Sequence, residues 1–567
     1  MTRIFKFDLS NVRGDVFGGI TAGIVALPLA LAFGVQSGLG AAAGMYGAMV
    51  LGFLAAWLGG TPSQVSGPTG PMTVVSAALA ANMTAMADSI ETGLSAVLLT
   101  FLLAGALQVI LGLVRVGKYI RLVPYPVVSG FMSGIGVIII LLQVFPIMGH
   151  ASPPVIIDVF MEVGRPLAGI DVHAVLLAAV TLAIIYLFPL VTTKIPGTLV
   201  ALILVSIVPM VLGWDVPRIG SIPQGLPELK IAGMFSIDAH LWSTIFTDAV
   251  ALSVLGSLDS LLTSLVADSK TRTRHDSERE LIGQGIGNMA SSIFGGIPGA
   301  GATMRTVVNI QAGGRTRISG MIHGLFLLVV LLGAGKLAEE IPLAVLAGIL
   351  VSVGLAIMDT RGVKQLRYAP RADAAVLVLV LVFTVFFDLI QAVALGLALA
   401  SLLFMKRMGD ESSDRSEVGT MDELMREPKD PEERELHNMF KGKVHVHKLH
   451  GPLHFGFTST LQDMAASIPD TPHVLIRMRE VPFMDQSGLN TVMEIIQDLS
   501  DKGTKVYITG LQRQPAQLLK DLHVAPGIVP KEHILNGFRE LLPIVAQYEG
   551  NSEGPPVKGN TQKEEPK

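Results

Sequence analysis

Gly59-Gly-Thr-Pro62, followed by Gly67-Pro-Thr-Gly-Pro-Met-Thr-Val-Val75, is a stretch of Gly, Pro and Thr that separates two apolar runs. A second stretch has the same pattern: Gly295-Gly-Ile-Pro298, followed by Gly301-Ala-Thr-Met-Arg-Thr-Val-Val308. Matching interruptions in the two halves of a membrane chain indicate a transporter whose substrate binds near the bilayer midplane. The pair therefore predicts a carrier and the place where it holds its cargo.

The composition around these stretches is that of a membrane protein. The chain has 567 residues, of which 50% are hydrophobic and 16% charged, and its mean hydropathy is +0.56. Apolar runs long enough to cross a hydrocarbon core of ~30 Å lie between about residues 15 and 407. They predict an all-α polytopic domain of about fourteen segments, built as a seven-plus-seven inverted repeat. The expected spans are 16–34, 40–58, 70–86, 94–113, 124–147, 173–190, 196–213, 243–265, 281–297, 303–312, 317–335, 341–357, 373–388 and 390–405.

The distribution of basic residues predicts the orientation of these segments. With the N-terminus inside, the even-numbered connections face the cytoplasm, and they are the basic ones: Arg115, Lys118, Arg121, Lys194, Lys270, Arg272, Arg274, Arg279, Arg315, Arg317, Arg361, Lys364, Arg367 and Arg371. The odd-numbered connections hold scattered basic residues only. No small-residue cleavage site follows the first apolar run, so we expect a retained helix and not a signal peptide.

A soluble region is expected after the last apolar segment. Residues 1–407 form the predicted transmembrane domain, 408–438 a charged linker, 439–549 a small α/β domain and 550–567 a disordered tail. Strands are predicted over 443–449, 473–478 and 505–509, and amphipathic helices are predicted to begin near Thr458, Gln486, Pro515 and Lys531.

The interrupted segments have the chemistry of an anion site. If 71–73 and 303–305 each begin a half-helix, two N-termini of about +0.5 charge each face one point and together match a monovalent anion. Thr69 and Thr303 offer hydroxyl donors, and Gly70 and Gly301 let the backbone approach a ligand. The alternative is that these glycines only pack helices together.

Asp259 is the candidate cation ligand. It lies within Leu255-Gly-Ser-Leu-Asp-Ser-Leu-Leu-Thr263, an apolar helix in which a carboxylate costs about 2.5–3.5 kcal/mol. Thr263 follows at i+4 on the same face, so the two supply oxygen ligands for Na⁺. The alternative is that Asp259 caps a broken helix or pairs with an arginine, and Arg305 is the expected partner. Because Arg305 restores a charge of about +1 to the site, an anion would not strictly require a cation.

Other motifs were weighed for chemistry. Asp485-Gln-Ser-Gly488 falls between a strand and a helix, where Ser487 is either a regulatory phosphosite or, like Asp485, part of a helix cap; the cap is favoured. His445 and His447 share a strand face, which we expect to be exposed. The absence of Cys excludes disulfides, thiolate metal sites and cysteine catalysis. No nucleophile elbow, P-loop or dinucleotide fingerprint is found, so no enzyme activity or cofactor is expected. No basic stripe suggests nucleic acid.

With these motifs the chain resembles the sulfate permease (SulP) family, also called solute carrier family 26. The resemblance is carried by four sequences: Gly67-Pro-Thr-Gly-Pro-Met72, Glu280-Leu-Ile-Gly-Gln-Gly-Ile-Gly-Asn288, Arg305-Thr-Val-Val-Asn309 and Gln311-Ala-Gly-Gly-Arg315. Val481-Pro-Phe-Met-Asp-Gln-Ser-Gly-Leu489 looks like the signature of a STAS domain. Within the family, the sequences around Asp259 and Gly299-Ala-Gly-Ala-Thr-Met304 look most like BicA-type bicarbonate transporters.

The resemblance implies a function and a set of site residues. It implies sodium near Asp259, Thr263, Gly301, Ala302 and Thr303, and bicarbonate between Thr69 and the Ala302–Thr303 backbone. The residues themselves add Gly70 and Arg305 to the expected anion site. It also implies homodimers and a core domain that moves against a gate domain. Arg305 departs from the BicA-type pattern, in which Gly is expected.

The resulting prediction is a secondary transporter in a bacterial inner membrane, with its N-terminus and STAS domain cytoplasmic, that takes up bicarbonate with sodium. Three alternatives stay open: a sulfate or other oxyanion permease, a nucleobase permease, and a sensor that does not transport.

Overall fold

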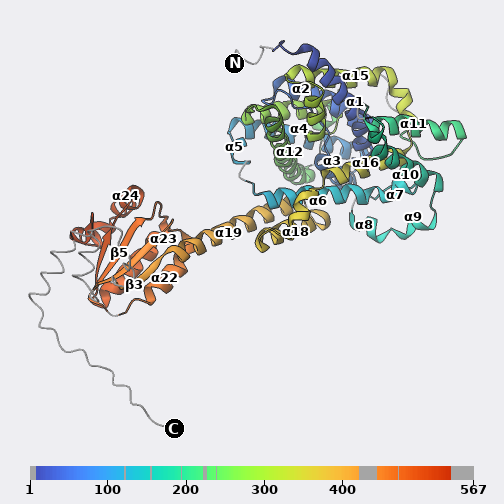
Figure 1. Ribbon diagram of the computed structural model, residues 1–567. Helices are drawn as coiled ribbons and strands as arrows, with labels where there is room; N and C mark the ends of the chain where they lie inside the picture. Colours follow the sequence, from blue (N-terminus) through green and yellow to red (C-terminus); the bar gives the residue numbers. More distant parts are fainter. Residues whose placement is uncertain are drawn as a thin grey trace, which may run out of the picture. The chain divides into compact units, whose positions relative to one another are not determined.

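The chain folds as two units, Met1–Ala400 and Ser401–Lys567 (Figure 1). The computed structural model describes residues 8–120, 123–153, 156–192, 195–220, 227–235, 237, 239–387, 389–420, 444–469, 471–537 and 540.

The first unit is built of helices, and every one of the fourteen expected spans coincides with one. The long helices are α1 (Val12–Gln36), α2 (Ala41–Leu58), α3 (Gly70–Met86), α4 (Ile90–Leu113), α6 (Tyr125–Leu142) continued by α7 (Val144–Ile147), α10 (Val172–Leu187), α11 (Gly197–Leu212), α12 (Trp242–Thr271), α13 (Ser277–Ile293), α14 (Thr303–Gln311), α15 (Arg317–Glu339), α16 (Leu343–Ile357), α18 (Arg371–Phe386) and α19 (Leu389–Arg415). The prediction of an all-α membrane domain is confirmed. Short elements connect them: α5 (Gly117–Ile120), α8 (Ile156–Met161), α9 (Gly164–Ala168), η1 (Phe188–Leu190), η2 (Ala232–Phe235), η3 (Ala239–Leu241) and α17 (Thr360–Gln365).

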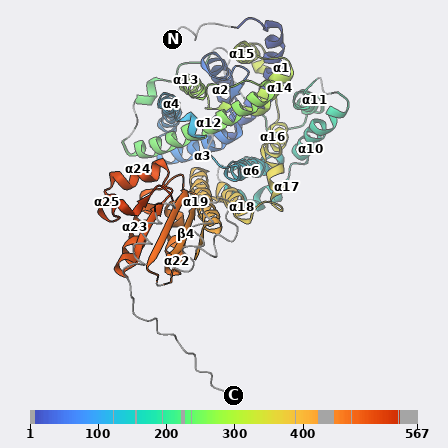
Figure 2. The ribbon, with the colours of Figure 1, turned by 60° about the vertical axis from the view of Figure 1, so that its left-hand side comes forward.

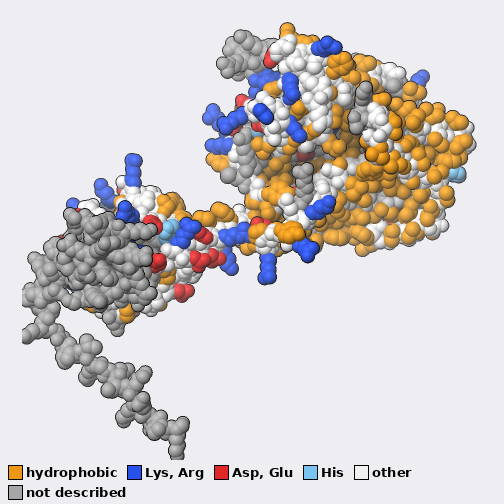
Figure 3. Space-filling model, in the orientation of Figure 1, with side chains coloured by type: hydrophobic (Ala, Val, Ile, Leu, Met, Phe, Trp, Pro, Cys, Tyr) orange, Lys and Arg blue, Asp and Glu red, His pale blue; other side chains and the backbone are white. Residues whose placement is uncertain are grey.

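The surface of this unit is suited to lipid. Seven of the described helices are long and apolar enough to cross a membrane, and three shorter apolar helices accompany them. Over α10 and α11 the exposed side chains are hydrophobic, among them Leu176, Val180, Ile203 and Val211 (Figure 3). A large exposed apolar surface of this kind is stable only against an apolar solvent.

Helices that carry the interrupted segments pack closely. Helix α14 lies beside α1 and α12, as Figure 2 shows. Helix α13 packs against α2 and α4, and its approach to α4 depends on a pair of glycines. A Cβ on Gly105 would lie 2.7 Å from the carbonyl oxygen of Gly285, so any larger residue would push the two backbones apart. Helix α13 begins four residues before the apolar run because Asp276 caps it, accepting a hydrogen bond from the Arg279 N–H at 3.1 Å.

The second unit is an α/β domain with one five-stranded sheet. The strand order is β3 (Glu417–Thr420), β4 (Val444–His450), β5 (His473–Glu480), β6 (Lys505–Thr509) and β7 (Ile534–Leu535); β3 is antiparallel to β4 and the others are parallel. The helical elements are η4 (Phe455–Phe457), α22 (Thr458–Ala466), α23 (Gln486–Asp501), α24 (Arg513–Asp521), α25 (Val524–Gly527) and η5 (Lys531–His533). Residues of α22, α23 and α24 share one hydrophobic core with β5 and β6.

The predictions for this unit hold with three differences. The three expected strands are present, and α22 and α23 begin where predicted. The prediction of a helix near Lys531 is wrong, because that segment is one 3-10 turn that leads into β7. Residues 408–420, within the expected linker, form the end of α19 and strand β3. Residues 421–438 and the expected tail lie outside the described residues.

The prediction that His445 and His447 lie on an exposed strand face is also wrong. Their side chains pair in register with Val474 and Ile476, which belong to the hydrophobic core, and they are 7% and 1% exposed. Burial, together with the neighbouring His445, lowers the pKa of His447 to about 4. The alternation of side chains along a strand does not predict which face of the sheet the helices cover. An imidazole on the covered face is buried, and burial favours its neutral form.

This histidine predicts a pH dependence of the second unit. Since the pKa of His447 is about 4 when folded and 6.5 when unfolded, the unfolded state binds the proton more tightly. Stability should be complete above pH ~6.5 and fall as the pH drops toward 4, by about 2 kcal/mol at pH 5. Hydrogen exchange of the β4 and β5 amides in the full chain, corrected for intrinsic rates, measures this loss. His447→Leu should remove this share of the loss and leave that of His473 and His533, whose pKa values burial also lowers, whereas His523→Gln, at an exposed position, should not change the loss. Equal losses in both variants would contradict the assignment.

Candidate functional site

The two interrupted segments meet in the first unit as a short antiparallel strand pair, which we call the crossing. Strand β1 (Ser66–Gly67) pairs antiparallel with β2 (Ala300–Gly301), with Ser66 opposite Gly301. The Ala302 N–H extends the ladder by donating to the Val65 carbonyl at 2.9 Å. Segments more than 200 residues apart in sequence are thereby joined through their backbones.

Each segment leads directly into a half-helix. Helix α3 begins at Gly70 with Thr69 as its N-cap, and α14 begins at Thr303 with Ala302 as its N-cap. Neither cap side chain bonds to the first turn of its helix. The first N–H groups of a helix have no intrahelical acceptor and carry a partial positive charge. Since each helix starts within three residues of the β1–β2 pair, the two electropositive ends lie close together.

Helix α12 forms a wall that touches both half-helices. The Thr263 hydroxyl donates to the Gly301 carbonyl at 2.8 Å and is 2.7 Å from the Thr303 hydroxyl. One turn earlier, Ser260 accepts from the Gly301 N–H at 3.1 Å. Asp259 precedes Thr263 by four residues and therefore lies on the same face of α12. Oxygen atoms of Thr263, Gly301 and Thr303 are thus in mutual contact, with Asp259 one helical turn away on the same face, and oxygens are the ligands that a hard cation prefers.

Asp259 also borders a small cavity. Its side chain is 8% exposed, and its Oδ2 is buried without a hydrogen-bond partner among the described residues. The cavity has a volume of about 20 Å³ and is lined by Val123, Val127, Val128, Phe131, Met132, Leu258, Asp259, Leu262 and Val393. That volume holds about one water-sized particle. The carboxylate therefore faces an apolar compartment the size of one small ion.

Arg305 occupies the other side of the crossing. It is 2% exposed, and its Nη2 donates to the Pro68 carbonyl. Its Nη1 lies beside Gly67, where a Cβ would come within 2.6 Å of it, and has no partner among the described residues. The expected pairing with Asp259 is not formed as an ion pair within 4 Å; the two groups interact at longer range. The guanidinium instead donates to the carbonyl of Pro68, the residue that follows β1, because this oxygen is within hydrogen-bond reach.

Polar atoms without partners gather around these residues. Beside Asp259 Oδ2 and Arg305 Nη1, the hydroxyls of Thr69 and Thr73 are buried and unbonded within the described chain. A buried donor or acceptor that stays unpaired costs about 1–3 kcal/mol. Hydroxyl and guanidinium donors next to two helix N-termini suit a small oxyanion, and the carboxylate suits a cation beside it.

A buried carboxylate that sequence reasoning left without a role supports the crossing. Glu280, on α13, accepts from the Gly60 and Thr61 N–H groups at 2.9 and 2.8 Å and from the Gln64 and Gln284 amides at 2.7 and 2.8 Å. Two turns from Glu280, Asn288 bonds the Gly299 N–H and carbonyl at 2.9 and 3.0 Å. Polar residues at i, i+4 and i+8 of a membrane helix were the available signal, because they share one face.

Gly299→Ala should break the crossing. The added Cβ would overlap the Gly67 carbonyl and lie 2.7 Å from the Pro68 nitrogen, and these are backbone atoms that cannot rotate away. We expect lower thermal stability in detergent and, for a transporter, at least about tenfold slower uptake, or 1.4 kcal/mol. Gly333→Ala is the control, since that helical glycine has nothing within 4 Å of its Cβ position. A Gly299→Ala protein with normal stability would contradict the description.

In the second unit, Asp485 is the cap expected from its sequence. It is the N-cap of α23 and accepts from the Gly488 N–H at 2.7 Å. Ser487 is exposed in the first turn of the helix, so its hydroxyl is accessible. Its phosphorylation stays a prediction.

Comparisons with known families match both units. The profile of the sulfate permease family matches residues 12–380, and that of the STAS domain matches residues 439–536. The bicarbonate transporter BicA of a Picosynechococcus species is 41% identical over 94% of this chain and 94% of its own length. BicA of a Synechocystis species is 40% identical over 95% of both chains. A putative sulfate transporter of Bacillus subtilis is 32% identical over 91% of this chain and 95% of its own.

Solved structures agree with these matches. The transmembrane domain of a cyanobacterial BicA superposes with a TM-score of 0.64 at 46% identity, covering 68% of this chain and 98% of that one. A murine solute carrier 26 family member A9 anion transporter, in the inward-facing state, has a TM-score of 0.77 at 18% identity, covering 96% of this chain and 92% of its own. The second likeness concerns the fold alone.

Proposed function

This chain belongs to the sulfate permease family, and we propose that it is a secondary transporter that takes up bicarbonate together with sodium. The observation that supports the proposal most is the meeting of α3, α14 and Asp259 at the β1–β2 crossing. Relatives at 40–41% identity over nearly the whole chain carry the name bicarbonate transporter, which supports bicarbonate as the cargo.

The anion binds between the two half-helix ends. Its oxygens accept hydrogen bonds from the Thr69 hydroxyl and from the first N–H groups of α3 and α14, that of Thr303 among them, with Gly70 and Ala302 providing close backbone. Arg305 adds a full positive charge beside them. These groups are fixed before the anion arrives, so little ordering opposes binding.

Sodium binds on the α12 side. Its ligands are oxygens of Asp259, Thr263, Gly301, Ala302 and Thr303, of which the first two come from successive turns of one helix. A cation at this position neutralises Asp259, and the anion then meets a more positive site. The two ions therefore favour each other's binding, as symport requires.

Alternating access involves helices that face the ends of the half-helices. A Cβ on Gly70 would lie 2.7 Å from Ile139 on α6 and 2.8 Å from Ile357 on α16, so apolar side chains stand against the tip of α3. Movement of the crossing, together with α12, relative to α6 and α16 would expose the site to one side and then the other. The protein works as a homodimer in a bacterial inner membrane, with its N-terminus and STAS domain cytoplasmic.

Arg305 favours a second candidate function, a permease for sulfate or another oxyanion. A buried guanidinium with a free Nη1 compensates anionic charge without sodium. Bacillus subtilis has a relative named as a putative sulfate transporter at 32% identity. This candidate predicts uptake that does not depend on sodium and that sulfate inhibits.

Uptake of labelled bicarbonate into proteoliposomes separates the candidates. The purified full chain is reconstituted, and uptake is measured with an inward sodium gradient, with potassium in its place, and with excess sulfate outside. The proposal expects uptake that requires sodium and that excess sulfate does not inhibit. Sodium-independent uptake that sulfate inhibits would replace it with the oxyanion permease. Absence of uptake both of labelled bicarbonate and of labelled sulfate, measured in parallel, would overturn the carrier itself.

A further inference from the structure

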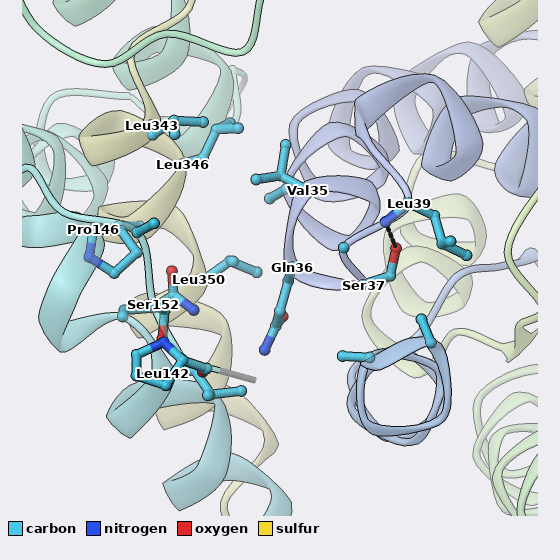
Figure 4. A pocket seen from close by; sticks show the side chains of 18 of the residues that line it. Val35, Gln36, Ser37, Leu39, Leu142, Pro146, Ser152, Leu343, Leu346 and Leu350 are labelled. Atoms are coloured by element: carbon cyan, nitrogen blue, oxygen red, sulfur yellow. Dashed lines mark hydrogen bonds between the residues drawn. The ribbon is translucent and has the colours of Figure 1, made fainter. Parts of the chain in front are cut away.

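A second cavity in the membrane unit lies apart from the ion site. It has a volume of about 380 Å³ and is lined by the ends of α1, α3 and α6, by α7 and by the start of α16 (Figure 4). Most of its wall is apolar, with Leu142, Pro146, Leu346 and Leu350 among the lining side chains. The described residues that line it include no Asp, Glu, Lys or Arg.

One polar side chain in this wall differs from the rest. Gln36, the last residue of α1, extends into the cavity, and both its Nε2 and its Oε1 are buried without a partner in the described chain (Figure 4). The other polar side chains of the wall have partners within the chain: Ser37 with Gly34, Thr84 with Ala80, Gln143 with Ile139, His150 with Gly169 and Ser152 with Pro153. A whole unpaired amide at an apolar wall calls for a ligand that supplies both a donor and an acceptor.

We infer that this cavity binds a small uncharged molecule that carries a carboxamide-like group on an apolar body. A second amide forms two hydrogen bonds with the Gln36 amide, one in each direction, while its apolar part packs against the leucines. The cavity is in the size range of small-molecule sites. A charged ligand would lose its hydration without gaining a counter-ion, because no opposite full charge of an Asp, Glu, Lys or Arg lines the described wall.

The site is separate from the ion site. It shares no lining residue with the cavity at Asp259. Among the lining residues on α3, Ala77 lies nearest to the start of the helix at Gly70. It is seven residues from Gly70, which is ~10 Å along the helix axis. A bound molecule would contact α1 and α3 on one side and α6 and α16 on the other. If those helices move during transport, which rests on the proposed function, the ligand slows uptake without competing with the anion.

Binding of benzamide to the full chain in detergent tests the site without any transport assay. Saturation-transfer NMR titration should show binding to the unaltered protein and at least about tenfold weaker binding to Gln36→Leu. Gln143→Leu is the matched control, because the amide nitrogen of Gln143 already donates to Ile139, and it should change affinity little. Benzoate, which replaces the amide by a charged group, should bind at least about tenfold more weakly than benzamide.

A second variant guards against misfolding of the first. Ala80→Leu fills part of the cavity while keeping Gln36 itself and should abolish benzamide binding. Absence of benzamide binding to the unaltered protein, or equal binding to the unaltered protein, Gln36→Leu and Ala80→Leu, would overturn the inference. In proteoliposomes, benzamide should lower the maximal uptake rate and leave the apparent affinity for the anion unchanged. Loss of that effect with retained binding would count against the proposed function and not against the site.

Discussion

Asp259→Asn should abolish the sodium dependence of uptake and slow it at least about tenfold, equivalent to 1.4 kcal/mol. Asn has nearly the same shape, but it removes the one full negative charge that α12 places beside Thr263 and Thr303. A sodium ion loses its coulombic attraction in a site with little water, where that attraction is strongest. Uptake of labelled bicarbonate across a sodium titration measures the effect.

Two further measurements make this result specific to the cation site. Asp268→Asn, on the same helix, is the control, since Asp268 contacts His275 and takes no part in the site. It should keep the sodium dependence. Sodium should raise the thermal unfolding temperature of the unaltered protein and of Asp268→Asn, but not of Asp259→Asn, because only a bound ligand stabilises the folded state. A sodium titration unchanged by Asp259→Asn would refute the assignment.

Glu280→Gln should lower the stability of the membrane unit by about 3 kcal/mol, since a buried carboxylate with several donors is replaced by a mismatched amide. One Glu280 oxygen accepts from two backbone N–H groups and the other from the Gln64 and Gln284 amides. A glutamine has one acceptor, so its NH₂ group must face a pair of donors. Gln64 cannot turn over to help, because its own oxygen accepts from Ser264 at 2.9 Å.

The loss should appear both in thermal unfolding in detergent and in uptake, because the loop that Glu280 holds leads into β1. Glu278→Gln is the matched control: it is the same substitution in the first turn of the same helix, at a partly exposed position. Its stability and uptake should stay near those of the unaltered protein. A Glu280→Gln protein as stable as Glu278→Gln would show that these hydrogen bonds contribute little.

The sequence was sufficient for the membrane helices and for the two half-helices. Apolar length and glycine-proline interruptions are local properties, and each expected span coincides with a helix. The β1–β2 pair was not foreseen, since two residues on each side give no periodicity to detect. The expected pairing of Arg305 with Asp259 is not formed within 4 Å: charge predicts the attraction, but the position of the Pro68 carbonyl decides which acceptor is within hydrogen-bond reach.

The errors in the second unit have a comparable origin. His445 and His447 alternate as a strand should, but which face the helices cover follows from tertiary packing. The residues that support the site, Glu280 and Asn288, lie in one of the stretches that carry the family resemblance, but their hydrogen bonds to Gln64 and to Gly299 follow from tertiary packing.

The main-chain join between the two interrupted segments has a consequence for how such proteins diversify. The frame around the proposed site depends on hydrogen bonds between peptide groups, which most side-chain exchanges leave in place, while only a few side chains face the site. Exchanges at those positions can change the preferred ion and leave the architecture intact, so one scaffold can serve many nutrients.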